Sequence, residues 1–296
     1  MTGTGDRTNG RDTDSDAPPP EPQGDARGRT RTTGTTGASA DEAPPDHAGR
    51  PKAEPAGRDE PNGPPGDTHV ILVRHGHARA VELGIVAGHK GCAGLSATGR
   101  LQAEALRDRL AAVGTRADVM VTSVLPRAIE TAATIAPALG VAPGAIPQDC
   151  DLCERHPGEG DGLTWDELVA RYGALDPVRD PDRPMSPGGE SGRTFRRRAR
   201  DRVQRLADGN RGRTIVVVTH GGVILAVTLG LLGLGPRSFA HQLANTSVTE
   251  WVRTTDGRWL LHRFNDAAHL EALDTDGAAG RGSRREAAVP ARRGRA

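Results

Sequence analysis

Aromatic residues and cysteines are scarce in this chain. Its 296 residues include three Phe, three Trp, one Tyr and three Cys. Three cysteines in a chain that begins without an apolar signal segment are typical of a reducing compartment, so we expect a cytoplasmic location. Positive and negative side chains nearly balance, at a formal net charge of +1, which gives no general attraction to nucleic acid or to an anionic membrane.

Branched aliphatic residues are missing from the start of the chain. Residues 1–66 contain no Val, Ile, Leu or aromatic side chain, so they cannot bury enough apolar surface to offset the entropy lost on ordering. The last residues are rich in Gly, Ala and Arg. We therefore predict a disordered arm over residues 1–66, one folded domain over residues 67–272 and a disordered basic tail over residues 273–296.

Charged residues are absent from one stretch that is long enough to resemble a membrane span. Residues 215–234 contain no Asp, Glu, Lys or Arg, but Thr219-His220-Gly221-Gly222 interrupts the run. The β-branched residues before this interruption and the apolar residues after it predict a buried strand, a tight turn and a buried helix from Val223 to about Leu232. The arginine-rich segment after Ser191 has no alternating aromatic residue on which a base could stack, which predicts a solvated helix face. We expect neither a membrane nor a nucleic acid as partner.

Strand and helix patterns alternate over the predicted domain. Strand-like runs lie at residues 69–74, 118–122 and 214–219, and helical patterns follow Ser96, Pro126 and Ser191. Two further strands around Asp256-Gly257, a strong turn signal, predict an antiparallel hairpin. In the helix after Ser96, the positions expected to face the core are Leu101, Ala105, Leu106, Leu110 and Val113. Parallel strands joined by helices are covered on both faces, so we predict an α/β fold, a three-layer α/β/α sandwich with a mostly parallel central sheet.

Two of these strands end in the same dipeptide, histidine followed by glycine. His75 follows Arg74 at the end of the first strand, and His220 follows the third. Arg127 lies just after the second strand in the first turn of a helix, where free N–H groups and the helix dipole favour an anion. Ligands of open α/β sheets bind beyond the carboxyl ends of the strands, and the arginine fork matches phosphate oxygens. We therefore expect these four side chains to surround one phosphate group of a small phosphate ester.

Motifs of magnesium-dependent phosphate chemistry are missing from this edge. There is no phosphate-binding loop with its lysine, no Gly-x-Gly-x-x-Gly segment and no pair of carboxylates beside the two histidines, so we expect no metal and no other cofactor. Cys150 and Cys153 have the spacing of a metal-binding or redox pair, with His156 nearby. A second closely spaced pair of ligands is missing, and we interpret the cysteines as half-buried side chains beside Glu154.

The ordered set of motifs resembles the histidine phosphatase (phosphoglycerate-mutase-like) superfamily. The segments that carry the resemblance are Arg74-His75-Gly76, residues 95–103, residues 123–132, Leu152-Cys153-Glu154, residues 158–164, residues 187–191, His220-Gly221 and residues 245–248. They follow the family's order over residues 69–266. The resemblance implies a phosphoglycerate-mutase-like form of the α/β fold and a metal-independent phosphoric monoester hydrolase.

The resemblance also implies a role for each residue. His75 would be the nucleophile that takes the phosphoryl group as a covalent phosphohistidine. Arg74, Arg127 and His220 would bind the phosphate oxygens and stabilise the charge in transfer. Glu154 would protonate the leaving oxygen and then activate the water that hydrolyses the phosphohistidine.

Some positions depart from the family pattern. His77 stands where the family usually has Glu or Gln, and Val81 stands where the mutases have an asparagine that touches phosphate. Cys92-Ala93-Gly94 replaces the common acidic-Pro pair before the helix. One phosphate contact of the mutases is thereby lost or replaced.

The same residues favour the phosphatase branch of the family. Glu154 to Gly158 is similar to the Glu-Arg-His-Tyr-Gly of the mutases, but Pro157 replaces the tyrosine. The segment before Gly188 is shorter than the mutases' insertion, and Gly222 stands where they have asparagine. We predict a phosphomonoester hydrolase acting on a small phosphorylated metabolite, with mutase-type phosphoryl transfer as the alternative. A non-catalytic phosphate-binding module is a third hypothesis, and the oligomeric state is left open.

Overall fold

The computed structural model of this chain describes residues 66–236 and 242–274. The predicted arm lies outside the described residues except for Gly66, and the predicted tail lies outside them except for Leu273 and Asp274. Those two residues end a short helix, α7 (Glu271–Asp274), which continues two residues beyond the predicted end of the domain.

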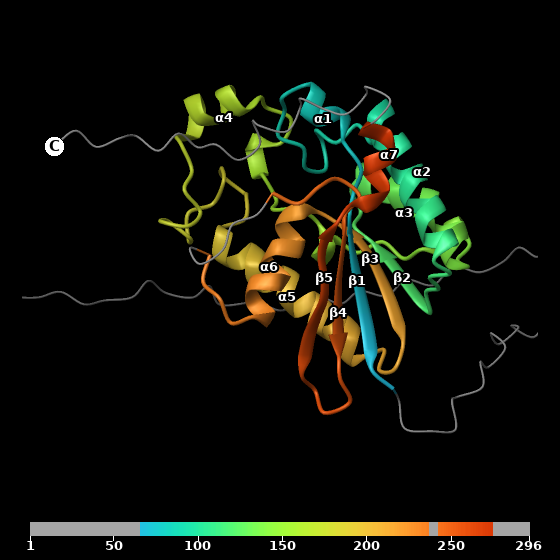
Figure 1. Cartoon of the computed structure of the whole chain (residues 1–296). Coiled ribbons are helices and arrows are strands. Elements are labelled where there is room, and N and C mark those ends of the chain that lie inside the picture. Colours follow the sequence, from blue (N-terminus) through green and yellow to red (C-terminus); the bar gives the residue numbers. More distant parts are fainter. Residues whose placement is uncertain (1–65, 237–241, 275–296) are drawn as a thin grey trace, which may run out of the picture. The chain divides into compact units, whose positions relative to one another are not determined.

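One five-stranded sheet, in the order β2-β3-β1-β4-β5, lies at the centre of the described part (Figure 1). Its strands are β1 (Thr68–Arg74), β2 (Val119–Thr122), β3 (Thr214–Thr219), β4 (Val248–Arg253) and β5 (Trp259–Asp266). Strands β1, β2 and β3 are parallel, whereas β4 runs antiparallel to β1, and β5 antiparallel to β4. The predicted hairpin around Asp256-Gly257 is therefore confirmed, with Gly257 at a φ of 88° that suits glycine.

Helices cover both faces of this sheet. They are α1 (Arg79–Glu82), α2 (Ala97–Ala112), α3 (Pro126–Ile135), α4 (Trp165–Tyr172), α5 (Gly192–Asp208), α6 (Gly221–Leu231) and α7. Short 3₁₀ turns are η1 (Ala136–Leu139), η2 (Pro143–Ala145), η3 (Cys150–Leu152), η4 (Gly158–Gly160) and η5 (Ala268–Leu270). The charge-free stretch is the strand β3, a turn and the helix α6, as predicted. No described helix combines the length and apolarity that crossing a bilayer requires.

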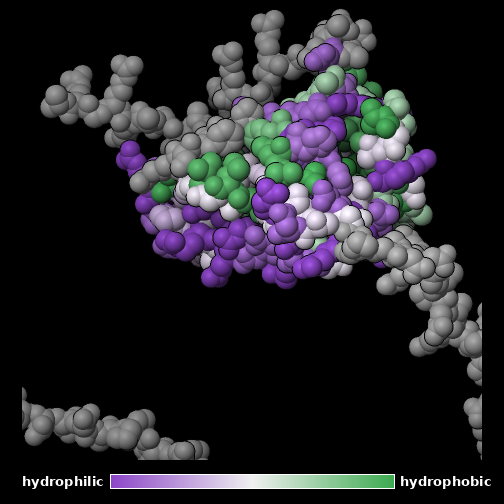
Figure 2. All heavy atoms as spheres, turned by 60° about the horizontal axis from the view of Figure 1, so that its bottom comes forward, coloured by the Kyte–Doolittle hydropathy of each residue, from purple (hydrophilic) through white to green (hydrophobic). Residues whose placement is uncertain are grey.

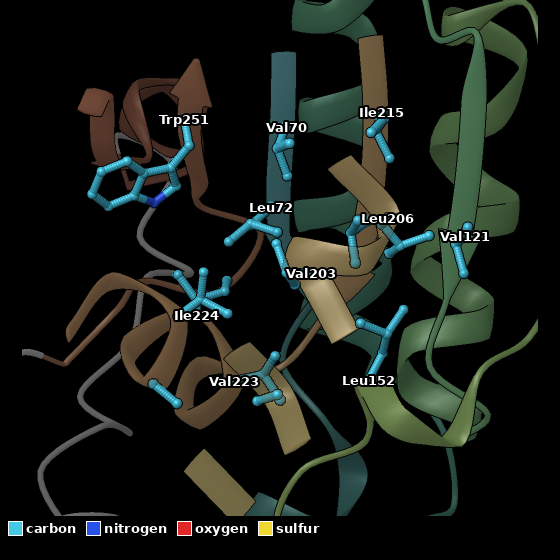
Figure 3. Packing of buried hydrophobic residues seen from close by; sticks show 14 of the residues in the cluster. Val70, Leu72, Val121, Leu152, Val203, Leu206, Ile215, Val223, Ile224 and Trp251 are labelled. Carbon is cyan, nitrogen blue, oxygen red and sulfur yellow. The ribbon is translucent and has the colours of Figure 1, made fainter. Parts of the chain in front are cut away.

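Alternating side chains of the strands fill two separate cores. Val70 and Leu72 point to the side of α5 and α6, where they pack with residues such as Val203 and Ile224 (Figure 3). Ile71 and Val73 point to the opposite side and pack against α2 and α3. Successive residues of a strand face opposite sides of a sheet, so β-branched residues at every position build both cores at once. The predicted three-layer α/β/α sandwich is confirmed.

The buried face of α2 agrees with the predicted one at Leu106 and Leu110 and differs from it at Leu101 and Val113. Ser96 caps this helix as expected, accepting a hydrogen bond from the backbone N–H of Gly99 at 3.0 Å. Leu101 and Val113, however, are 49% and 64% exposed, while Gly99, Ala103, Leu106 and Leu110 face the core. A Cβ atom at Gly99 would lie 2.0 Å from the backbone oxygen of His77. This close approach fixes the rotation of the helix, and the residues on the face of Gly99 are then the buried ones.

Hydrophilic residues cover much of the molecular surface seen in Figure 2, and hydrophobic residues form separate patches among them. The arginines of α5 contribute to the hydrophilic surface, but many of them are paired rather than simply solvated. Ion pairs join Arg193 to Asp182, Arg198 to Glu190, Arg202 to Asp149 and Arg205 to Asp151. The predicted solvated face of this helix is thus partly wrong, because acids distant in sequence pack against it.

Candidate active site

The register of β1 and β3 brings the two histidines together. Arg74 pairs with Thr219 across these parallel strands, so the next residues, His75 and His220, lie side by side at the same edge of the sheet. Their ring centroids are 5.0 Å apart, with an interplanar angle of 61°. His75 is 6% exposed and His220 is fully buried. The predicted meeting of both imidazoles at one sheet edge is confirmed.

The hydrogen bonds of His75 determine which of its nitrogens carries the proton. Nδ1 lies 2.6 Å from the backbone oxygen of Gly76, which can only accept. Nε2 lies 3.1 Å from Nε of Arg127, which can only donate. The proton is therefore on Nδ1, and Nε2 presents a lone pair. Burial lowers the pKa of His75 well below its ordinary value, and the charges of Arg127 and Arg74 lower it further, so the imidazole stays neutral.

His220 is held by a residue to which the sequence analysis gave no role. Its Nε2 lies 2.8 Å from Oγ of Ser123, which follows β2. Its Nδ1 is buried and has no hydrogen-bond partner among the described residues. Burial lowers the pKa of His220, and the nearby charge of Arg127 adds to this effect. An orphaned, buried nitrogen is costly unless a ligand satisfies it, which marks the space beside His220 as a binding position for a polar group.

The two arginines are fixed by backbone oxygens. Arg127 is 5% exposed and lies in the first turn of α3, and its Nη1 donates to the backbone oxygen of Ala87 at 3.0 Å. Arg74, at the end of β1, donates to the backbone oxygen of Leu243. Asn245 supports the same edge, since its side-chain amide donates to the backbone oxygen of His75 at 3.2 Å. The first two contacts fix the guanidinium groups, and the third fixes the backbone of His75.

Glu154 is positioned by the N-terminus of α6. Its Oε2 accepts a hydrogen bond from the backbone N–H of Gly222 at 2.9 Å, and its Oε1 accepts one from the backbone N–H of Arg155 at 3.1 Å. A Cβ atom at position 222 would lie 2.2 Å from Oε1 of Glu154. The second glycine of His220-Gly221-Gly222 is therefore needed for the carboxylate to sit against the start of the helix.

Arg198 of α5 anchors the segment that carries Glu154. Its Nη1 donates to the backbone oxygens of Asp151 at 2.8 Å and of Cys153 at 3.0 Å. Its other nitrogens form a two-point ion pair with Glu190, at 2.9 Å and 2.7 Å. One planar guanidinium thus ties η3 and the start of α5 to each other, a geometry for which arginine is suited.

A cavity of about 700 Å³ opens over this edge of the sheet. Arg74, His75, Arg127 and Glu154 line it, whereas the fully buried His220 is not among the described residues of its lining. Apolar side chains form much of the remaining lining, among them Val86, Trp165, Met185, Phe195, Leu225 and Leu229. The cavity is much larger than one phosphate group, so it has room for the rest of a small ester.

Two more cations line the cavity away from the histidines. Arg155 and Arg196 are half-buried, and neither guanidinium has a hydrogen-bond or ion-pair partner in the part of the chain that the structure describes. Burial lowers the pKa of both groups. The charges of Glu154 and Glu190 only partly offset this effect at Arg155, and charged groups that lose hydration without gaining a direct hydrogen bond favour an anionic ligand. This pair was not predicted, because Arg155 and Arg196 belong to different segments of the chain and come together only in the lining of the cavity.

The positions that depart from the family pattern have three different surroundings in the structure. Nδ1 of His77 lies 2.9 Å from Oγ of Ser96, and His77 is not among the described residues that line the cavity. Val81 does line the cavity. Cys92 is buried beside Leu125 and Cys153. His77 therefore supports the start of α2 rather than replacing the missing asparagine.

Comparison with known proteins gives one consistent family. Residues 70–267 match the model of the histidine phosphatase superfamily (branch 1). The chain is 32% identical over 210 residues to a metal-independent phosphoserine phosphatase of Arabidopsis thaliana, covering 70% of this chain and 84% of the relative. It is 34% identical over 206 residues to phosphoglycerate mutase-like protein 4 of the same plant, covering 68% and 86%.

A solved structure is similar over the same part of the chain. The mycobacterial glucosyl-3-phosphoglycerate phosphatase in complex with VO3 superposes with a TM-score of 0.57 at 28% identity. The match covers 67% of this chain and 99% of that one. The sequence motifs, the fold and the comparisons therefore all indicate the same protein family.

Proposed function

Because the chain belongs to the histidine phosphatase superfamily (branch 1), we propose that it hydrolyses phosphate monoesters through a covalent phosphohistidine on His75. One observation carries this proposal. Nε2 of His75 is unprotonated and accepts a hydrogen bond from Nε of Arg127 at 3.1 Å, and both residues line the cavity. When Arg127 donates to a phosphoryl oxygen instead of to His75, the lone pair of Nε2 is freed next to the phosphorus atom.

The first step transfers the phosphoryl group to the enzyme. Nε2 of His75 attacks phosphorus, the N–P bond forms and the ester P–O bond breaks. Arg74 and Arg127 neutralise the charge on the phosphoryl oxygens, and we assign the neighbouring His220, whose ring centroid lies 5.0 Å from that of His75, to stabilise the same charge through Nδ1, which has no hydrogen-bond partner among the described residues. Ser123 supports donation from Nδ1 when its hydroxyl proton points to Nε2 of His220. The leaving oxygen takes a proton from Glu154, which lines the same cavity.

The second step returns the enzyme to its starting state. Glu154, now a carboxylate, accepts a proton from water as the water oxygen attacks phosphorus. The N–P bond breaks, its electron pair returns to Nε2 of His75, and inorganic phosphate leaves. No step requires a metal ion, which agrees with the name of the plant relative.

The substrate class follows from the unpaired cations of the cavity. We assign Arg155 and Arg196 to a second anionic group, so the substrate is a small phosphate ester that also carries a carboxylate or another anion. Phosphoserine and glucosyl-3-phosphoglycerate, named with two of the similar proteins, both have a carboxylate. The apolar lining accommodates the uncharged part of such an ester.

One incubation series separates hydrolysis from mutase-type transfer. The purified protein is given p-nitrophenyl phosphate, and separately 3-phosphoglycerate with and without its bisphosphate. A phosphatase releases inorganic phosphate from both, whereas isomerisation of phosphoglycerate that far exceeds phosphate release would support the mutase. The His75→Ala variant should release none, and the matched His69→Ala variant, in which the substituted residue lies at the other end of β1, should stay active.

The proposed function also bears on the binding partners of the protein and on its location in the cell. We infer a cytoplasmic enzyme that acts on a small molecule rather than on nucleic acid. Cys92, Cys150 and Cys153 are all free thiols, which suits a reducing compartment. The ion pairs of the α5 arginines leave less positive surface for a nucleic-acid backbone.

A further inference from the structure

Four side chains with metal-binding atoms meet at one place beside the active site. They are His89, Cys150, Cys153 and His156, and their ligand atoms all lie within 4.8 Å of one another. Sγ of Cys150 is 3.6 Å from Nε2 of His89 and 3.6 Å from Nε2 of His156. We propose that these four residues bind one zinc ion as a closed structural site.

The donor set and its spacing fit zinc. Zinc in structural sites takes four ligands in a tetrahedron, and two cysteines with two histidines are one of its usual sets. Bond lengths of about 2.3 Å to sulfur and about 2.0 Å to nitrogen place neighbouring ligand atoms about 3.3–3.8 Å apart. Both sulfur–nitrogen distances of Cys150 already have that value. The remaining atoms need to move by about 1 Å or less to reach it.

The backbone that carries these ligands is held by other contacts. Arg198 fixes the segment of both cysteines through the backbone oxygens of Cys150, Asp151 and Cys153. The backbone of His156 exchanges hydrogen bonds with Glu190, the acid that pairs with Arg198. A metal site on anchored backbone loses little entropy when the ion binds.

His89 is anchored independently. The carboxylate of Asp161 accepts hydrogen bonds from the backbone N–H groups of Gly88, Lys90 and Gly91, at 2.8, 2.8 and 2.9 Å. The loop that presents His89 is thus shaped by a half-buried carboxylate that binds the backbone on either side of the histidine. His89 lies 61 residues before Cys150, which is why the spacing of the cysteines alone did not reveal a fourth ligand.

The proposed ion would join two loops that build the phosphate site. One loop contains Ala87, whose backbone oxygen holds Arg127, and the other continues from Cys153 into Glu154. Oγ of Ser123 lies 3.3 Å from Sγ of Cys153 and 2.8 Å from Nε2 of His220. None of the four ligands is among the described residues that line the cavity. The ion would therefore stabilise the site and take no part in the chemistry.

The test measures metal binding to the full-length protein under reducing conditions. Bound metal is removed from the protein with a chelator, and zinc or cobalt(II) is then added back. The metal content is determined by mass spectrometry. We expect one metal ion per chain, and with cobalt the visible absorption of a tetrahedral ion with sulfur ligands. Cys150→Ser and His89→Gln should each weaken binding by at least about 100-fold, since loss of a direct ligand costs no less than loss of an outer-shell partner. Both side chains are exposed, so these variants should fold.

Two matched variants serve as controls. Cys92→Ser removes the thiol outside the cluster, and His262→Gln removes an exposed histidine of β5. Both should bind metal like the unchanged protein, and zinc should raise their unfolding temperature but not that of His89→Gln. Failure of the reduced protein to take up zinc in stoichiometric amount would overturn the proposal, as would equal binding by Cys150→Ser. Metal content and phosphatase activity are measured separately, so either proposal can fail alone.

Discussion

Replacing Gly222 by alanine should displace the carboxylate of Glu154 and leave the fold intact. A Cβ atom at this position would lie 2.2 Å from Oε1 and 2.9 Å from the carboxyl carbon of Glu154. The carboxylate must then retreat by about 1 Å, and a misplacement of that size costs about 10²-fold in rate. This factor equals about 2.7 kcal/mol of transition-state stabilisation. The obstructing atoms belong to the end of a flexible side chain, so the cost in folding stability should be small.

The assay compares kcat/KM for two esters. p-Nitrophenolate leaves without a proton, whereas the alkoxide leaving group of 3-phosphoglycerate needs one from Glu154. The alkyl ester should therefore lose about 10²-fold in kcat/KM and the p-nitrophenyl ester much less, because only the former depends on the proton donor. Glu154→Gln should give the same pattern. Gly221→Ala is the control, since its Cβ would make an ordinary contact of 3.4 Å with Nε of Arg74. Equal losses for both esters would refute the reasoning, because they would indicate damage to phosphate binding instead.

Three further perturbations test the rest of the site. Ser123→Ala removes the partner of the buried Nε2 of His220, and should destabilise the protein by about 1–3 kcal/mol in chemical denaturation and lower kcat; unchanged stability would contradict the assigned hydrogen bond. Arg127→Lys loses the planar fork and should reduce kcat/KM by about 10²–10³-fold; steady-state assays that find near-normal activity would show that a point charge suffices. Burial lowers the pKa of His75 and His220 in the folded state. Below about pH 6.5 the unfolded chain therefore binds more protons than the folded chain, and the free energy of unfolding should decrease as the pH falls below this value. Chemical denaturation should give a larger free energy of unfolding at about pH 7.5 than at about pH 5.5, and this difference should be smaller for His75→Gln.

Much of the fold could be predicted because its local signals agree with its tertiary contacts. The β-branched runs of β1 and β3 are buried on both faces, so their composition alone indicated central parallel strands. The two histidines follow those strands directly and had to meet once β1 and β3 paired. Arg127 was located in the same way, from a proline that begins α3 just after β2. Side chains fixed by strand ends are therefore the predictable part of this site.

The remainder depends on contacts between segments that are distant in sequence. The arginines of α5 looked solvated because their acidic partners, Asp149, Asp151 and Glu190, belong to other segments. Leu101 was wrongly placed on the buried face of α2, because the contact of Gly99 with the backbone of His77 turns this side chain to the surface. His89 gave no signal at all, since a single histidine in a loop has no periodicity. Such features follow from packing and could be found only in three dimensions.

The central claim is that His75 carries the phosphoryl group during turnover. The Glu154→Gln variant lacks the proposed base for the second step, so phosphorylated enzyme should accumulate during its reaction with p-nitrophenyl phosphate. Quenching the reaction would then trap this species. Peptide mass spectrometry and ³¹P NMR should then find an acid-labile phosphoramidate on Nε2 of His75. Phosphate on another residue, or turnover of the ester with no covalent phosphate at His75, would contradict the account.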